Sequence, residues 1–194
     1  MNTNVLNYRY CPFCSGELVK LKEEDKERLA CETCRWVYYP GVSMASAAIV
    51  YRSGEVLLVR RNREPHKGTW SLPGGFLEYH EHPEDTARRE LEEETNLKAI
   101  TAKFIKFVKS NEDPRSPGHL VFFYLLTAKG QIANRDLDEN SKVAWFKIDK
   151  LPEIGWPTHK EILQSSDLMT EINSIEISEI FSEVLSEQKG REHV

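Results

Sequence analysis

The chain has 194 residues, of which 40% are hydrophobic and 29% charged, a mixture that favours a packed globular protein over a disordered chain. Its formal net charge of -5 makes nucleic acid an unlikely partner, because polynucleotide-binding proteins usually carry a basic face. No apolar run approaches the ~20 residues of a membrane span, and no N-terminal apolar segment resembles a secretory signal, so we expect a cytoplasmic protein that does not bind membranes.

Four cysteines near the N-terminus form two pairs, each with a two-residue gap, and sixteen residues separate the pairs. They are Cys11, Cys14, Cys31 and Cys34. Such gaps let each pair aim both thiolates at one metal ion, and four thiolates complete the tetrahedral shell of structural Zn²⁺. Two disulfides or a redox pair are the alternatives, which a reducing compartment disfavours. With a hairpin expected between the pairs, residues 1–41 predict a small zinc ribbon.

Basic and aromatic side chains follow the last cysteine, at Arg35, Trp36, Tyr38 and Tyr39. Interleaved residues of these types can stack on nucleic-acid bases. Packing of the rings against the next domain is the simpler interpretation, and we prefer it. The Pro40-Gly41 turn that follows indicates a domain boundary.

Apolar and β-branched runs predict the strands of a larger domain over residues 42–165. The expected strands cover residues 43–51, 56–59, 102–108, 120–126 and 143–146. Arg60, Arg61 and Arg63 follow the second run. They are either ordinary surface charge or phosphate-binding groups, and we name Arg60 and Arg61 as candidate substrate-binding residues.

Residues 75–97 predict a glycine-rich turn that leads into a carboxylate-rich helix. Pro83 suits the first helical position. At 3.6 residues per turn, Glu90, Glu93 and Glu94 lie on one side of this helix, beside a more apolar stripe that would pack inward. Three glutamates alone are also compatible with an exposed acidic face.

The same stretch resembles the Nudix box, the signature of hydrolases that cleave nucleoside diphosphates linked to another moiety. The matching positions are Gly75, Glu81, Arg89, Glu90, Leu91, Glu93, Glu94 and Leu97. The family's second glycine is replaced by Asn96, the residue next most able to adopt the left-handed conformation that ends a helix. The resemblance implies an α/β fold, a Nudix α/β/α sandwich with a mixed sheet, after the ribbon.

The resemblance also implies a metal site. The carbonyl of Gly74 and the carboxylates of Glu90 and Glu94 would bind Mg²⁺ or Mn²⁺, since hard cations prefer oxygen ligands. Glu93 would assist by hydrogen bonding or proton transfer. These three glutamates therefore form the expected catalytic set.

Two further roles follow from the resemblance. Arg89 and Glu81 would pair to orient the helix and the loop before it. Several relatives carry a loop glutamate before the last strand that acts as a base or an additional metal ligand, and Glu139 occupies that place. Asp138, or a merely solubilising role for Glu139, is the alternative.

A polar, proline-rich loop at residues 111–119 lies between two predicted strands, and such loops on a rigid sheet often determine substrate choice. It contains Arg115, a third candidate substrate-binding cation. A proline at this distance beyond the box resembles ADP-ribose pyrophosphatases. A ribbon followed by the box resembles NADH pyrophosphatases, but their Ser-Gln-Pro-Trp-Pro-Phe-Pro-like motif is absent. We therefore expect Mg²⁺-dependent cleavage of ADP-ribose or a similar nucleotide sugar.

Other activities remain open. They are cleavage of NADH or FAD, removal of pyrophosphate from a modified nucleoside triphosphate, and a non-catalytic nucleotide- or RNA-binding role. The intact glutamate set disfavours the last, because a sensor need not retain metal ligands. Residues 166–194 show helical apolar spacing and are expected to form a helical tail that covers the domain or contacts a second subunit of a homodimer.

Overall fold

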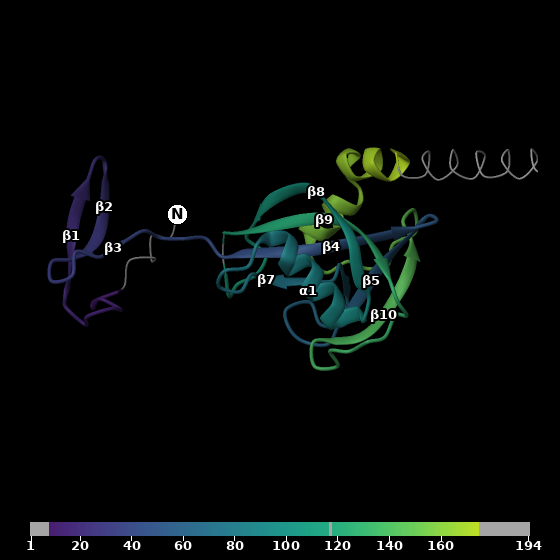
Figure 1. Ribbon diagram of the computed structural model, residues 1–194, viewed down its shortest axis with the longest axis horizontal. Helices are drawn as coiled ribbons and strands as arrows, with labels where there is room; N and C mark the ends of the chain where they lie inside the picture. The colour runs from purple at the N-terminus through teal and green to yellow at the C-terminus, as the bar shows by residue number, and fades with distance from the viewer. Residues whose placement is uncertain (1–7, 117, 175–194) are drawn as a thin grey trace, which may run out of the picture. The chain divides into compact units, whose positions relative to one another are not determined.

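The computed structural model describes residues 8–116 and 118–174. The chain divides into two compact units, Met1–Val42 and Ser43–Val194, and each unit has its own sheet (Figure 1). The predicted tail beyond residue 174 lies outside the described residues.

The smaller unit is a three-stranded antiparallel sheet of β1 (Leu18–Glu23), β2 (Lys26–Cys31) and β3 (Val37–Tyr38). The β1–β2 hairpin turns at Glu24 and Asp25, where Glu24 adopts a positive φ of 51°. Its buried residues include Leu29, Ala30 and the two buried cysteines. So few apolar residues make a marginal core.

The larger unit contains a mixed sheet with the strand order β10-β5-β4-β9-β8. These strands are β4 (Met44–Arg52), β5 (Glu55–Arg61), β8 (Lys98–Ser110), β9 (His119–Lys129) and β10 (Asn140–Lys147). Two short strands, β6 (Trp70–Ser71) and β7 (Gly74–Phe76), pair with β5 and β4. β4 and β9 run parallel while the other described pairs are antiparallel.

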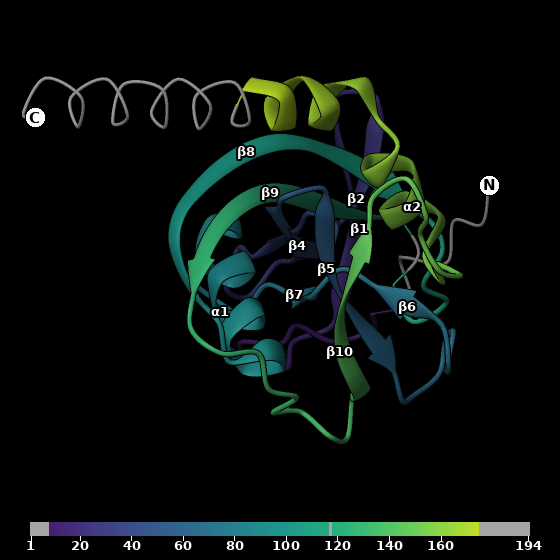
Figure 2. The same ribbon diagram turned by 90° about the vertical axis from the view of Figure 1, so that its right-hand side faces the viewer.

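Helices cover both faces of this sheet (Figure 2). Helix α1 (Pro83–Thr95) packs Ala87 and Leu91 against one face. Helix α2 (Pro157–Leu163) and helical residues 166–174 pack on the other. Alternate residues of β4 enter the two cores, as expected for a strand buried on both sides. The predicted α/β/α sandwich is confirmed.

All five strands differ from their predicted bounds by at least one residue, and two of them show a physical reason. β8 extends beyond the expected 102–108 at both ends, and β-bulges interrupt its alternation of inward and outward residues. β10 begins at Asn140 instead of residue 143. Its first residues are polar and therefore predicted a loop, but the Asn140 side chain is buried against α1.

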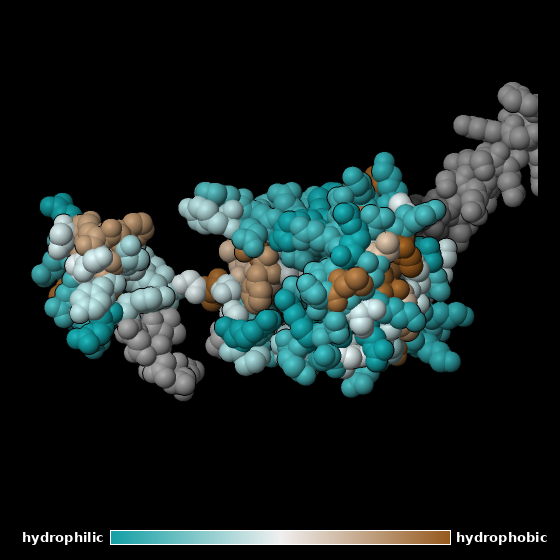
Figure 3. Space-filling model, turned by 90° about the horizontal axis from the view of Figure 1, so that it is seen from below, coloured by the Kyte–Doolittle hydropathy of each residue, from teal (hydrophilic) through white to brown (hydrophobic). Residues whose placement is uncertain are grey.

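Hydrophilic residues dominate the surface of the larger unit on the side drawn in Figure 3, with hydrophobic residues in small groups. Among the described residues, no helix has the length and apolar character to cross a membrane.

Candidate active site

Helix α1 begins and ends as its sequence predicts. Pro83 occupies the first turn, and the preceding residue, His82, caps the helix by accepting a hydrogen bond from the Glu84 N–H at 3.3 Å. Asn96 ends it in the left-handed conformation, with φ of 64°, and donates its N–H to Glu92. The replacement of the family's glycine by asparagine therefore preserves the cap.

The three predicted site glutamates on α1 differ in burial. The Glu94 residue is 4% exposed, whereas the side chains of Glu90 and Glu93 are 14% and 55% exposed. Burial raises the pKa of Glu90 above its ordinary value. The helix thus presents a graded series from a buried carboxylate to a solvated one.

Glu94 is held by two hydrogen bonds from outside the helix. Its Oε2 accepts the Gly74 N–H at 2.9 Å, and its Oε1 accepts the Asn140 side-chain amide at 2.6 Å. Burial raises the pKa of Glu94 to about 8, and the neighbouring charges of Glu90 and Glu139 add to the effect. A cation placed among these carboxylates would relieve both penalties.

Two glycines allow the turn before α1 to approach its carboxylates. A Cβ atom on Gly74 would lie 2.5 Å from the carbonyl oxygen of Ser46, on β4. A Cβ on Gly75 would lie 2.2 Å from Oε1 of Glu90. Both distances are far below van der Waals contact, so a side chain at Gly75 would occupy the space of the Glu90 carboxylate.

Arg89 connects the turn to the helix. Its guanidinium donates to Glu81 at 2.6 and 2.9 Å, to Glu90 at 2.7 Å, to Glu93 at 3.0 Å and to the carbonyl of Phe76 at 3.2 Å. The hydrogen bonds from Arg89 lower the pKa of Glu81 to about 2. Arg89 and Glu81 therefore form the pair that the resemblance to the Nudix box implied.

A cavity of about 370 Å³ opens beside these residues. Glu90, Glu93, Gly74, Arg61 and Arg115 line it, as does Glu139 from the segment before β10. The predicted site residues thus converge from α1, β5, β7 and two loops. Two predicted site residues, Arg60 and Glu94, are not among the described lining residues. Nε of Arg60 donates to the carbonyl of Gly68 at 2.8 Å, and Glu94 is buried.

The arginines that line the cavity are restrained by the protein. Nε of Arg61 donates to the Pro65 carbonyl at 2.7 Å, and its guanidinium lies 5.0 Å from the ring centroid of Trp156. Arg115 makes a bidentate pair with the buried Asp113, with a shortest distance of 2.7 Å. Such fixed guanidinium groups are suited to phosphate oxygens.

Glu139 forms an ion pair with Arg63, another residue that lines the cavity. Its side chain is one-third exposed. Its backbone is fixed, since its carbonyl accepts the Asn62 N–H at 2.7 Å and its own N–H donates to Asp136 at 2.9 Å.

Sequence reasoning missed two groups at this site. Asn140 contacts Glu94 although 46 positions separate them. Asp113 orients Arg115 from within the predicted specificity loop. The contact of Asn140 depends on how two distant segments meet, so no local pattern indicates it. Asp113 and Arg115 are only two positions apart, and their spacing is a local signal that could have indicated the pair.

His159 lies on α2 and also lines the cavity, and the residue is buried. Its Nδ1 accepts the Leu72 N–H at 3.1 Å, which requires a neutral ring. Burial, together with the nearby charge of Arg61, lowers the pKa of His159 to about 3. The centroid of the ring lies 5.5 Å from that of Phe123, so His159 also contributes to packing in the core.

The donor set fits a hard divalent cation. Glu90 and Glu94 supply carboxylate oxygens. Gly74, whose N–H donates to Glu94, supplies a carbonyl oxygen in the same turn. Each oxygen of Glu94 accepts one protein hydrogen bond, which leaves lone pairs for a metal.

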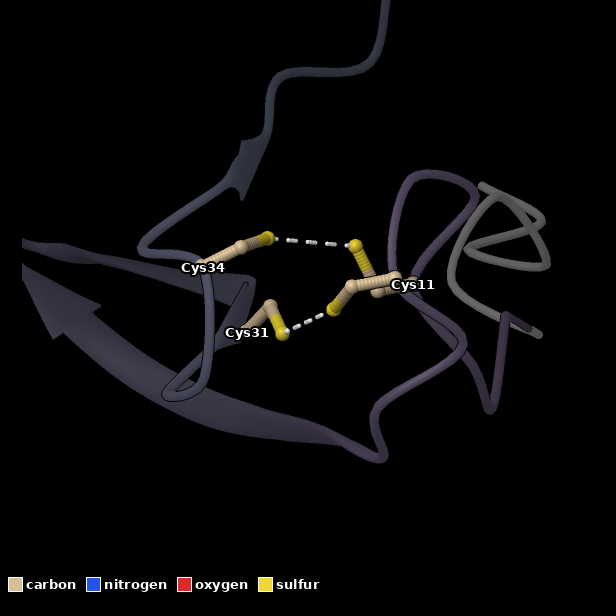
Figure 4. A group of neighbouring side chains, drawn as sticks. Cys11, Cys31 and Cys34 are labelled. Carbon is tan, nitrogen blue, oxygen red and sulfur yellow. Dashed lines mark hydrogen bonds between the residues drawn. The ribbon is translucent and has the colours of Figure 1, made fainter.

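The four cysteine thiols of the ribbon also converge. Their Sγ atoms all lie within 4.8 Å of one another. Sγ of Cys11 is 3.5 Å from that of Cys34, and Sγ of Cys14 is 3.4 Å from that of Cys31; Figure 4 shows the two pairs of sulfur atoms facing each other.

Both cysteine turns have the same backbone pattern. The N–H groups of Ser15 and Arg35 donate to the carbonyls of Cys11 and Cys31, and Ser15 and Arg35 both adopt a positive φ. Four free thiols on two matching turns form a donor set that fits tetrahedral Zn²⁺.

Comparisons with known proteins agree with this geometry. Residues 42–165 match the family model described as NUDIX domain. Over 152 residues the chain is 30% identical to the NAD-capped RNA hydrolase NudC of Pectobacterium atrosepticum, a match that covers 78% of this chain and 55% of that protein. The chain therefore spans about half the length of this relative.

Two other matches cover most of the compared protein. The ADP-ribose pyrophosphatase of Methanocaldococcus jannaschii is 28% identical over 163 residues, which is 83% of this chain and 86% of that protein. The crystal structure of a MutT NUDIX hydrolase from Burkholderia pseudomallei gives a TM-score of 0.61 at 26% identity and covers 66% of this chain and 99% of that one.

Proposed function

The chain belongs to the Nudix family, and from this premise we propose that it is a metal-dependent pyrophosphohydrolase whose substrate is a nucleoside diphosphate derivative. ADP-ribose or a similar nucleotide sugar is the first candidate. The observation that carries this proposal is that Glu90 and Gly74 line a cavity together with the restrained Arg61 and Arg115, while Glu94 is hydrogen-bonded to Gly74.

Glu90, Glu94 and the carbonyl of Gly74 are assigned to hold Mg²⁺ or Mn²⁺. The metal, when bound, would stabilise the negative charge that develops on the diphosphate oxygens. Arg89 fixes Glu90 and Glu93 through its Nη1 atom. The arginine therefore sets the geometry of the carboxylates, and its full set of protein partners argues against a direct role in substrate binding.

Two carboxylates that line the cavity, Glu93 and Glu139, are the candidate acceptors for the proton of the attacking water. Glu93 is bonded to Arg89 at 3.0 Å, whereas Glu139 pairs with Arg63. For ADP-ribose, water adds to one phosphorus and the bridging P–O bond breaks, which gives AMP and ribose 5-phosphate.

Arg61 and Arg115 are assigned to bind the phosphates, because both line the cavity with their guanidinium groups already oriented. Arg60, expected to join them, makes its contact with Gly68 and receives no role in this proposal. The cavity volume falls within the range typical of small-ligand sites, about 300–1,000 Å³.

ADP-ribose is the first candidate because the relative from Methanocaldococcus jannaschii, which this chain matches over 86% of its length, is an ADP-ribose pyrophosphatase. Cleavage of an NAD-type dinucleotide is the second candidate, favoured by the similarity to an NAD-capped RNA hydrolase. Both substrates present the same nucleoside diphosphate group to the glutamates.

The ribbon is proposed to bind one structural Zn²⁺ through Cys11, Cys14, Cys31 and Cys34. The short distances between the sulfur atoms support this assignment. All four cysteines of the chain are used, so the closed shell leaves no position for substrate.

A hydrolysis panel tests the proposed function. The full chain is incubated with Mg²⁺ and, separately, ADP-ribose, NADH, FAD, nucleoside triphosphates and diadenosine polyphosphates, and the products are identified by chromatography. We expect ADP-ribose to give AMP and ribose 5-phosphate. Its kcat/KM should be higher than that of any other substrate in the panel. A panel without any turnover would overturn the enzyme assignment in favour of a binding module.

A further inference from the structure

Beyond the glutamates, we infer that Asn140 is a positioning residue that holds Glu94 in the orientation needed to bind the divalent cation. This inference rests on the proposed function, since it assigns a partner to one of the proposed metal ligands. Asn140 is not part of the Nudix-box pattern in this chain, which ends at Leu97.

The contact between Asn140 and Glu94 is short and buried. Nδ2 of Asn140 donates to Oε1 of Glu94 at 2.6 Å, and the two residues are 2% and 4% exposed. The Gly74 N–H holds the other oxygen, Oε2, at 2.9 Å. With one donor on each oxygen, rotation of the carboxylate breaks at least one buried hydrogen bond, which is unfavourable where water cannot replace it.

Asn140 is itself fixed by its backbone. Its N–H donates to the Asp136 carbonyl at 2.9 Å, and its carbonyl accepts the Asn134 amide at 2.7 Å. It also pairs with Arg61 at the start of β10. The side-chain amide of Asn140 is therefore positioned before a metal binds. Little conformational entropy is then lost in orienting Glu94 when the metal binds.

The neutral amide is suited to this task. A lysine or arginine in its place would also donate to Glu94, but its positive charge would repel a divalent cation. Asparagine directs the carboxylate without adding charge. Its immediate neighbour is Glu139, so the same short segment fixes one proposed ligand and carries a proposed proton acceptor.

Removal of the amide should weaken metal binding. Loss of an outer hydrogen-bond partner of a ligand typically lowers metal affinity about 10- to 100-fold. Asn140→Leu keeps nearly the same shape without a donor. We expect it to raise the Kd for Mn²⁺ by about 10-fold or more, while Asn140→Ser, which retains a shorter hydroxyl donor, should give an intermediate Kd.

Mn²⁺ alone is the probe, titrated into the full chain without nucleotide while free Mn²⁺ is measured by electron paramagnetic resonance. Ser141→Ala is the matched control, because Ser141 is the next residue on β10 and is exposed. Its Kd should equal that of the wild type. The thermal melting of each metal-free variant shows whether it folds, and a change in Kd without loss of folding separates positioning from general stability.

The variant Glu94→Gln separates failure of the proposed metal site from failure of the role proposed for Asn140. If Glu94→Gln binds Mn²⁺ like the wild type, the proposed metal site fails, and the role of Asn140 fails with it. If Glu94→Gln loses affinity but folded Asn140→Leu binds like the wild type, the inference about Asn140 alone is overturned. Should Asn140→Leu not fold, the same criterion applies to Asn140→Ser, whose wild-type affinity would overturn the inference.

Discussion

Arg89 and Glu81 form the shortest described contact between the helix α1 and the turn that precedes it, with 2.6 Å between Nε and Oε1. Glu81 also accepts the backbone N–H of Glu78 and the hydroxyl of Thr86. This pair therefore closes the turn onto the helix, and it keeps the glycines of β7 beside the carboxylates.

The free energy of unfolding at acid pH should depend on the pair formed by Arg89 and Glu81. The pKa of Glu81 is lowered to about 2, below the ordinary glutamate value of about 4.3. Its stabilisation is therefore complete above about pH 4.3 and is lost as the pH falls towards 2. Urea unfolding at pH 6 and pH 3 should show that Glu81→Gln loses less stability on acidification than the wild type. Parallel losses in the two proteins would contradict the role given to the pair.

His159 predicts a second pH effect, in a higher range. The pKa of His159 is lowered to about 3, whereas the unfolded chain binds a proton at about pH 6.5. Protonation thus favours unfolding as the pH falls from 6.5 towards 3, by up to about 1.4 kcal/mol per pH unit. His159→Asn should show a shallower fall in the free energy of unfolding between pH 7 and pH 5, although its stability at pH 7 is lower. An equal slope would refute the buried neutral state.

The close approach at Gly75 predicts a functional defect. Gly75→Ala places a methyl group where Oε1 of Glu90 lies, 2.2 Å from the new Cβ, so Glu90 must move. We expect kcat/KM to fall by about 10²-fold or more, since displacement of a site by about 1 Å can have that effect. Gly41→Ala is the control, because nothing lies within 4 Å of a Cβ there. Similar steady-state kinetics for both variants would contradict the steric account.

The helix and its carboxylates could be predicted from the sequence because their signals are local. Pro83, the 3.6-residue spacing of the glutamates and Asn96 each specify geometry within a few residues. The zinc ribbon is predicted for the same reason, from the gaps within two cysteine pairs.

The rest of the site depends on contacts between distant segments. Asn140 reaches Glu94 across 46 positions, and no pattern near Asn140 indicates that contact. Glu112 accepts hydrogen bonds from the N–H and hydroxyl of Thr158 at 3.1 Å, which ties the specificity loop to α2. Arg60 and Arg61 are adjacent and chemically identical, but successive strand residues point to opposite faces, and only Arg61 is among the described residues of the cavity lining.

Removal of zinc should affect the ribbon alone. The described part of the ribbon, residues 8–42, has few buried apolar side chains, so most of the folding free energy of this unit should come from the metal. Chelation is expected to make residues 8–38 sensitive to limited proteolysis, while the melting temperature of the larger unit changes little. Unchanged protease resistance of this segment, after zinc loss is verified by mass spectrometry, would exclude a structural zinc site.

The metal dependence of ADP-ribose hydrolysis, compared between the wild type and Glu94→Gln, tests the central claim most directly. We predict that the wild type loses turnover in EDTA and regains it in excess Mg²⁺, with AMP and ribose 5-phosphate as products. Folded Glu94→Gln should remain about 10³-fold slower at every Mg²⁺ concentration, a loss comparable to that of other charge-stabilising groups in active sites. Turnover by Glu94→Gln at the wild-type rate, or wild-type turnover that persists in EDTA, would contradict the account.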